Sequence, residues 1–132
     1  YSSWDKINYL NQVSRLKVKD VLNESKIGLV TFHPIPNHIN SQPNKMFEYM
    51  AAGIVVIASD FPLWKKIIEE NKCGLLVDPR NPKEIAESID WIINNPEEAK
   101  IMGQNGRRAV IKKFNWDVES KKLIKFYKLI LN

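Results

Sequence analysis

The sequence predicts a doubly wound parallel α/β domain, Rossmann-like, with helices on both faces of the sheet. Three short apolar runs, 27–32, 54–58 and 74–77, have the continuous hydrophobicity of strands that are covered on both faces. Helical segments with recognisable caps alternate with these runs, and the chain has no internal repeat and no low-complexity linker. This alternation is typical of parallel sheets joined by right-handed crossovers.

The first unit is predicted to be a strand followed by a helix. Residues 7–13 carry a strand-like apolar set, and Ser14 is a suitable N-cap for the helix that follows. The apolar residues of that helix are Leu16, Val18, Val21 and Leu22. Together with the three apolar runs, this segment brings the number of predicted strands to four, and the run 74–77 is the last of them.

A long loop and a short helix are predicted between the second and third strands. Pro43 suits the first turn of the helix, where its missing N–H has no partner to lose. Met46, Phe47 and Met50 follow at helical spacing, and Gly53 suits a left-handed helix end.

Four further helices complete the pattern. One spans 63–71, and two begin near Pro82 and Pro96, each preceded by an asparagine cap and followed by acidic residues. The last runs from a cap at Asn115 to Leu131 as an amphipathic helix. Its candidate packing residues are Trp116, Leu123, Ile124, Tyr127 and Ile130.

Length and composition fit a single domain over residues 1–132. The chain has 132 residues, 44% of them hydrophobic, and no run approaches the roughly 20 apolar residues of a membrane-spanning helix. The N-terminus does not resemble a signal peptide and does not begin with Met, so we expect an excised fragment. A single cysteine, Cys73, allows no internal disulfide; we expect it to be buried, in a protein of a reducing, cytoplasmic compartment.

The formal net charge of +5 favours an anionic partner. Basic residues gather near the C-terminus, where they could face nucleic acid or an anionic membrane; they are Arg107, Arg108, Lys112, Lys113, Lys121, Lys122, Lys125 and Lys128. Asp117 and Glu119 dilute this set, and no aromatic-rich stacking motif accompanies it. We therefore interpret it as a solvated helix face and expect no nucleic-acid partner.

The ligand site is predicted at the carboxyl ends of the strands, where open α/β sheets bind ligands. Polar residues cluster there at the start of a helix, whose unpaired N–H groups and dipole suit a phosphate. These residues are Asn40, Ser41, Gln42, Asn44 and Lys45. Lys45 would add a positive charge.

Glu48 follows in the same helix. Its carboxylate could accept hydrogen bonds from a ribose diol at the edge of such a pocket. The alternative from spacing alone is an exposed helix glutamate, the commoner situation.

Two histidines lie in the loop before this helix. His33 and His38 could contact a donor or exchange protons, but neither has a Ser, Cys or second His partner at motif spacing, which favours a purely structural role. No Asp-x-Asp occurs, and the carboxylates have no spacing suited to Mg²⁺, so we expect no metal and no cofactor.

The segment Pro43–Asp60, PNKMFEYMAAGIVVIASD, resembles the signature of GT-B glycosyltransferases of group 1, similar to family 4. The resemblance continues through Asn71–Pro79, Met102–Arg108 and Phe114–Trp116 and covers nearly the whole chain. It implies the C-terminal, nucleotide-sugar-binding half of a GT-B fold, truncated at its N-terminus.

The resemblance also implies site roles. Glu48 matches the second glutamate of the family's E-x7-E motif, which binds the ribose hydroxyls, whereas Asn40 replaces the first glutamate. The loop Asn40–Asn44, Pro43 included, would lie over the donor sugar and diphosphate. Catalysis would be electrostatic and metal-independent, with a retaining course, and would stabilise the departing diphosphate.

For the parent protein, the resemblance implies a hexosyl-transferring enzyme of bacterial surface polysaccharide synthesis with a glycan or lipid-linked acceptor. The acceptor would bind a missing N-terminal domain, onto which the final helix would cross, so that Trp116, Phe126 and Tyr127 expose apolar surface here. The fragment alone would be inactive, and the intact enzyme would associate peripherally with the inner face of the membrane. Two alternatives stay open: a GT-B-fold sugar-nucleotide epimerase and a non-catalytic nucleotide-binding or interaction domain.

Overall fold

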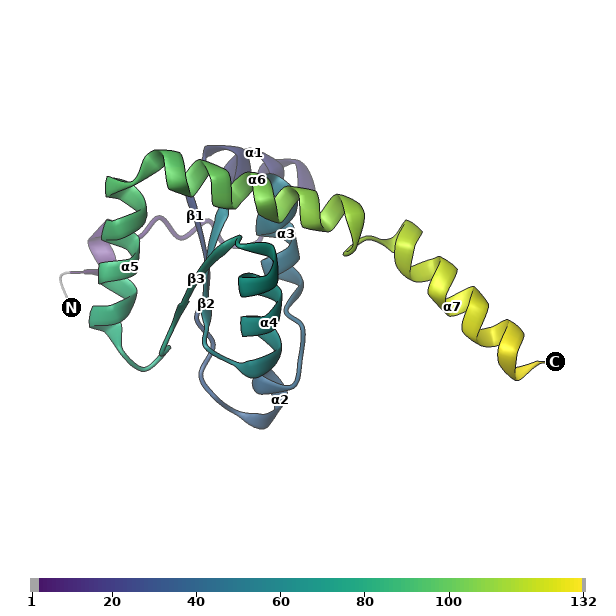
Figure 1. Ribbon diagram of the computed structural model, residues 1–132. Coiled ribbons are helices and arrows are strands. Elements are labelled where there is room, and N and C mark those ends of the chain that lie inside the picture. The colour runs from purple at the N-terminus through teal and green to yellow at the C-terminus, as the bar shows by residue number, and fades with distance from the viewer. Residues whose placement is uncertain (1–2, 132) are drawn as a thin grey trace.

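Figure 1 shows the computed structural model of the chain, which describes residues 3–131. The elements follow in the order η1 (Trp4–Lys6), α1 (Arg15–Glu24), β1 (Ile27–Val30), α2 (Pro36–Ile39), α3 (Asn44–Ala52), β2 (Val55–Ser59), α4 (Pro62–Asn71), β3 (Gly74–Val77), α5 (Pro82–Asn94), α6 (Pro96–Lys112) and α7 (Trp116–Ile130).

The strands form one parallel sheet in the order β1-β2-β3. Ile27 lies opposite Val55, and Val56 lies opposite Gly74. The central strand β2 is buried along its whole length, as its apolar sequence predicts for a strand covered on both faces. The three predicted runs are confirmed, with β1 ending at Val30, two residues before the predicted end.

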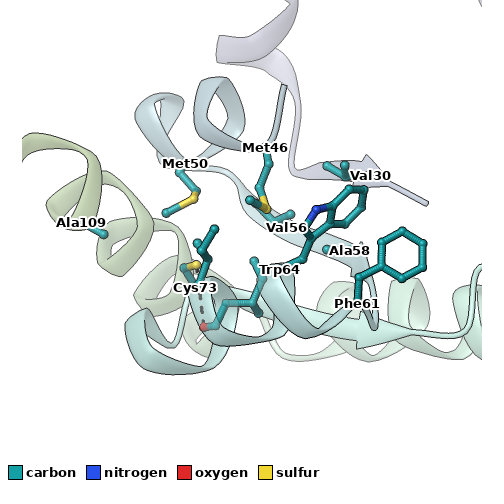
Figure 2. Packing of buried hydrophobic residues seen from close by; sticks show 11 residues of the cluster. Val30, Met46, Met50, Val56, Ala58, Phe61, Trp64, Cys73 and Ala109 are labelled. Atoms are coloured by element: carbon teal, nitrogen blue, oxygen red, sulfur yellow. Dashed lines mark hydrogen bonds between the residues drawn. The ribbon is translucent and has the colours of Figure 1, made fainter. Parts of the chain in front are cut away.

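Helices cover both faces of the sheet, which confirms the doubly wound α/β class (Figure 1). Side chains of α3 and α4 pack on one face against Val30, Val56 and Ala58 (Figure 2). On the other face, Val55 and Ile57 of β2 pack with Ile92 of α5.

Helix α6 closes the amino end of the sheet. A Cβ atom added to Gly103 would lie 2.0 Å from the carbonyl oxygen of Gly53, just before β2, so only glycine permits this approach. Asn105 Nδ2 donates a hydrogen bond of 3.0 Å to the carbonyl of Lys72, just before β3. Because α6 covers the amino end, a ligand site is expected at the carboxyl end, among the loops that follow the strands.

Most helix boundaries follow the predicted caps, but Asn95 makes no side-chain cap hydrogen bond to α6, because its Nδ2 donates to the carbonyl of Trp91 instead. Ser14 accepts a hydrogen bond from the Lys17 N–H, and Asn81 accepts one from the Glu84 N–H. Gly53 ends α3 in the left-handed region at φ +76°, as predicted. Pro43 differs slightly from the prediction because it occupies the N-cap position, one residue before α3 begins.

The predicted first strand, 7–13, is wrong, and in residues 3–131 the sheet has three strands instead of four. In the described residues, β1 pairs only with β2, so the segment has no neighbour for its backbone groups. Its apolar side chains, such as Ile7 and Tyr9, are exposed.

Helix α7 is confirmed, but its packing is not. Asn115 caps it as predicted, and the helix projects away from the sheet (Figure 1). None of its residues is buried, so the candidate packing residues Trp116, Leu123, Ile124, Tyr127 and Ile130 find no core to pack into among residues 3–131. The exposure expected of Trp116, Phe126 and Tyr127 is confirmed.

Candidate nucleotide-sugar site

The open carboxyl end of the sheet is built by the segments that follow each strand. The loop after β1 is the longest and includes α2 before it reaches α3. A hollow of about 590 Å³ lies here between this loop and the ends of β2 and β3. Its lining residues include Pro34, Ile39, Asp60, Asp78 and Arg80.

The start of α3 faces this end with backbone N–H groups that no side chain caps. Pro43 is buried at the N-cap and offers no side-chain hydrogen bond, whereas Asn44, the first helical residue, is exposed. The N–H groups of a helix's first turn have no intrahelical partner and carry the positive end of the dipole. This arrangement suits an anion, as the sequence predicts.

Glu48 shares an exposed stripe of α3 with Asn44. The two side chains are one turn apart, about 6 Å along the axis, whereas Met46 and Met50 point into the core. A ligand running along this stripe could place an anionic group at the helix start and a polyol beside the carboxylate.

Glu48 also lines a groove of about 700 Å³ between α1 and α3. Arg15 and Lys19 of α1 and Arg107 of α6 line the same groove. Arg15 and Lys19 were missed from the sequence, and Arg107 was assigned only to a solvated helix face. The signal was the spacing of Arg15 and Lys19, which places both on one face of the helix capped by Ser14.

The predicted loop residues are brought together, but their side chains face different partners. Asn40, the C-cap of α2, is exposed and donates from Nδ2 to the carbonyl of Pro36, the first residue of α2, at 3.2 Å. The Ser41 hydroxyl donates to the carbonyl of His38 at 3.2 Å. Gln42 is exposed and, with Asn44 and Phe47, lines a separate hollow of about 310 Å³.

Lys45 lies near the site, and its side chain is only partly exposed to solvent. Its Nζ is 4.5 Å from the centroid of the Phe32 ring, a cation–π contact. Burial lowers the pKa of Lys45 because it disfavours the charged form. The side chain therefore bridges the loop after β1 and the first turn of α3.

The histidines occupy the same loop and contact each other. His38 Nδ1 lies 2.9 Å from the carbonyl of His33, so Nδ1 is the protonated nitrogen. The His38 ring packs 4.8 Å from the Phe32 ring, while His33 is exposed. These contacts stabilise the conformation of the loop.

Two buried polar side chains that the sequence did not single out hold this loop. Ser59 Oγ donates to the carbonyl of Phe32 at 2.8 Å, and Trp64 Nε1 donates to the carbonyl of Ser41 at 2.6 Å. The sequence shows a serine at the end of an apolar strand and a tryptophan in an amphipathic helix, but neither pattern predicts which distant carbonyl the side chain will contact.

Within residues 3–131, His, Cys, Asp and Glu side chains form no group of three that could hold a metal ion. None of the helices in the same range is both long and apolar enough to cross a membrane.

Comparisons with known proteins identify one family and several relatives. Residues 1–109 match Glycosyl transferases group 1. The chain is 33% identical over 82 residues to the spore coat protein SA of Bacillus subtilis, covering 61% of this chain and 22% of that protein. It is 33% identical over 79 residues to the GDP-mannose-dependent alpha-(1-6)-phosphatidylinositol monomannoside mannosyltransferase of Mycobacterium tuberculosis, covering 60% and 20%.

Solved structures agree on the fold. Sucrose-phosphate synthase from Thermosynechococcus elongatus superposes with a TM-score of 0.84 at 24% identity, over 96% of this chain and 31% of that one. The C-terminal domain of a glycosyl transferase group 1 family protein from Francisella tularensis gives 0.66 at 23% identity, over 83% and 53%. The likeness shows the architecture of the C-terminal half of a GT-B fold.

The family match includes β1, α3 and β2, from which the candidate site is built. The chain spans about a fifth of the length of the curated relatives described above. On the residues matched, the chain belongs to the glycosyl transferases of group 1.

Proposed function

We propose that the chain binds the nucleotide-diphosphate sugar of a glycosyltransferase that transfers the sugar to a glycan or lipid-linked acceptor. The observation that carries this proposal is the stripe on α3, where Asn44 at the uncapped helix start and Glu48 one turn later are both exposed. The helix start suits a diphosphate, and a carboxylate can accept two hydrogen bonds from a ribose diol.

The groove beside Glu48 supports the same ligand class. Arg15, Lys19 and Arg107 line it and add positive charge around an anionic nucleotide. One relative is named for a GDP-mannose donor and a phosphatidylinositol mannoside acceptor, which supports a nucleotide-diphosphate donor and a lipid-linked acceptor for this chain's parent protein.

We further propose that the enzyme transfers a hexose with retention, in bacterial surface polysaccharide synthesis, at the cytoplasmic face of the membrane. It needs no metal because backbone N–H groups and basic side chains stabilise the departing diphosphate. Residues outside this chain bind the acceptor, so the chain by itself binds the donor without transferring sugar.

The test is a calorimetric titration of the chain with UDP, GDP and their sugar conjugates. We expect one nucleotide to bind, and Glu48→Gln to weaken it at least tenfold, because hydrogen bonds to a charged group contribute about 1.5–3 kcal/mol each. Glu70→Gln, on the exposed face of α4, is the matched control and leaves the affinity unchanged.

The outcomes separate the donor-site proposal from a non-catalytic interaction domain. Binding that is equal in the two variants would contradict the role of Glu48. Absence of nucleotide binding by the folded chain would count against the donor site and favour a non-catalytic interaction domain.

A further inference from the structure

A residue of the hydrophobic core is bonded to the proposed donor loop. Trp64 of α4 is fully buried, and its Nε1 donates to the carbonyl of Ser41 at 2.6 Å across 23 residues of sequence. Figure 2 shows the indole inside the cluster that also contains Val30, Met46 and Ala58.

The ring of Trp64 is fixed by its neighbours. It packs against Phe61 with ring centroids 4.7 Å apart and against Phe32 at 5.8 Å. An indole has one donor and no acceptor, and a buried donor without a partner is destabilising by about 1–3 kcal/mol. The Ser41 carbonyl is therefore held by a group that has little freedom to turn elsewhere.

The position of Ser41 gives this hydrogen bond a consequence for the site. Ser41 lies two residues before Pro43, the buried N-cap of α3, and Asn44 begins the helix. The side chains of Asn40, Gln42 and Asn44 are exposed, so they do not anchor this stretch in the core. The backbone path into α3 is anchored by the buried Pro43 and by the bond from Trp64.

We propose that Trp64 is a positioning residue for the donor loop, residues 40–44. Its indole N–H holds the Ser41 carbonyl and so aligns the backbone N–H groups at the start of α3 for an anion before the ligand arrives. The proposal rests on the proposed function of that loop. Preorganisation of this kind raises affinity because the ligand does not have to order the loop.

The experiment compares Trp64→Phe with Trp91→Phe in the whole 132-residue chain. Phe at position 64 keeps an aromatic ring in the core and removes the N–H donor. Trp91 is 40% exposed on α5 and is the control for loss of an indole. Amide hydrogen exchange of residues 40–46 is measured without ligand, and the affinity for the nucleoside diphosphate that binds the wild type is measured by calorimetry.

We expect faster exchange across 40–46 and an affinity about five- to tenfold lower in Trp64→Phe, with Trp91→Phe like the wild type. If Trp64→Phe does not fold, benzothienylalanine at position 64 replaces it, because its sulfur substitutes for the N–H in a ring of the same shape. That analogue also separates loss of the hydrogen bond from loss of packing.

Two results would overturn the proposal: exchange of residues 40–46 that is equal in the position-64 and Trp91 variants, or faster exchange with no change in affinity. A wild type that binds no nucleotide overturns the proposed function and with it the donor role of the loop. The exchange comparison still decides, in that event, whether Trp64 holds the loop.

Discussion

At the scale of single residues, Cys73 shows how the core changes the chemistry of a side chain. It is fully buried between α4 and β3, and its thiol lies 3.9 Å from the carbonyl of Ile68 (Figure 2). Burial raises the pKa of Cys73 from its ordinary value of 9.0 to about 11, because the thiolate is poorly solvated there. The sequence-based prediction of a buried cysteine is confirmed.

This shift makes the contribution of Cys73 to stability depend on pH. Between about pH 9 and pH 11 the unfolded thiol loses its proton while the folded thiol keeps it, so the unfolded state binds fewer protons. The stabilisation is complete below pH 9 and falls as the pH rises to about 11, by at most about 1.4 kcal/mol per pH unit.

The measurement is the free energy of unfolding in urea at pH 7, 9, 10 and 11 for the wild type and Cys73→Ala. Because other groups titrate equally in both proteins, the difference between them isolates the thiol. We expect the wild-type advantage to shrink above pH 9. An advantage that stays constant to pH 11 would show that the folded thiol ionises as easily as an exposed one.

At the scale of elements, the junction between α6 and α7 depends on one asparagine. Asn115 accepts the Val118 N–H at 3.1 Å as the cap of α7. Its Nδ2 donates to the carbonyls of Val110 and Ile111 at the end of α6, at 2.9 and 2.8 Å. One side chain thus ends one helix and begins the next.

We expect Asn115→Ala to destabilise the first turn of α7 by about 1 kcal/mol, since α7 has no buried residue to compensate for a lost cap. Amide hydrogen exchange of residues 116–120 would rise about fivefold, while exchange in β2 stays unchanged. Asn115→Asp is the matched control because it keeps the cap acceptor and removes both donors to α6. Equal exchange in the Ala variant and the wild type would mean that the cap does not limit the opening of α7.

At the scale of the whole molecule, the sheet and its covering helices form the stable body, and α7 stands outside it (Figure 1). Trp116 is 70% exposed, and the apolar side chains of α7 make no buried cluster in residues 3–131. An exposed apolar stripe of this kind favours association with another surface.

We expect a chain ending at Asn115 to unfold with a free energy within about 0.5 kcal/mol of the full chain, because α7 buries no side chain. It should also self-associate less at high concentration, which sedimentation velocity measures. The full chain carrying Phe126→Gln and Ile130→Gln is the control, since it keeps α7 but removes part of its apolar surface. A large loss of stability in the short chain would show that α7 supports the core.

Much of the fold could be predicted because its signals are local. The caps Ser14, Asn81 and Asn115 and the left-handed Gly53 act within one turn of their own position, so they mark helix boundaries in the sequence itself. The run that became β2 is hydrophobic throughout, which already indicates cover on both faces. The start of α3 and Glu48 were likewise predicted from neighbouring residues, and their role in binding stays a prediction.

The α/β class, most helix boundaries and the family could thus be predicted from the sequence alone. So could the three strand runs, predicted at 27–32, 54–58 and 74–77 and observed as Ile27–Val30, Val55–Ser59 and Gly74–Val77. That 7–13 is not a strand and that α7 is unburied became clear in the folded structure, because pairing and burial require a partner elsewhere in the fold. The groove between α1 and Glu48 and the bond from Trp64 to Ser41 likewise depend on the tertiary structure. These contacts join residues far apart in the chain, and no local pattern of caps or periodicity specifies which distant side chain will arrive beside another.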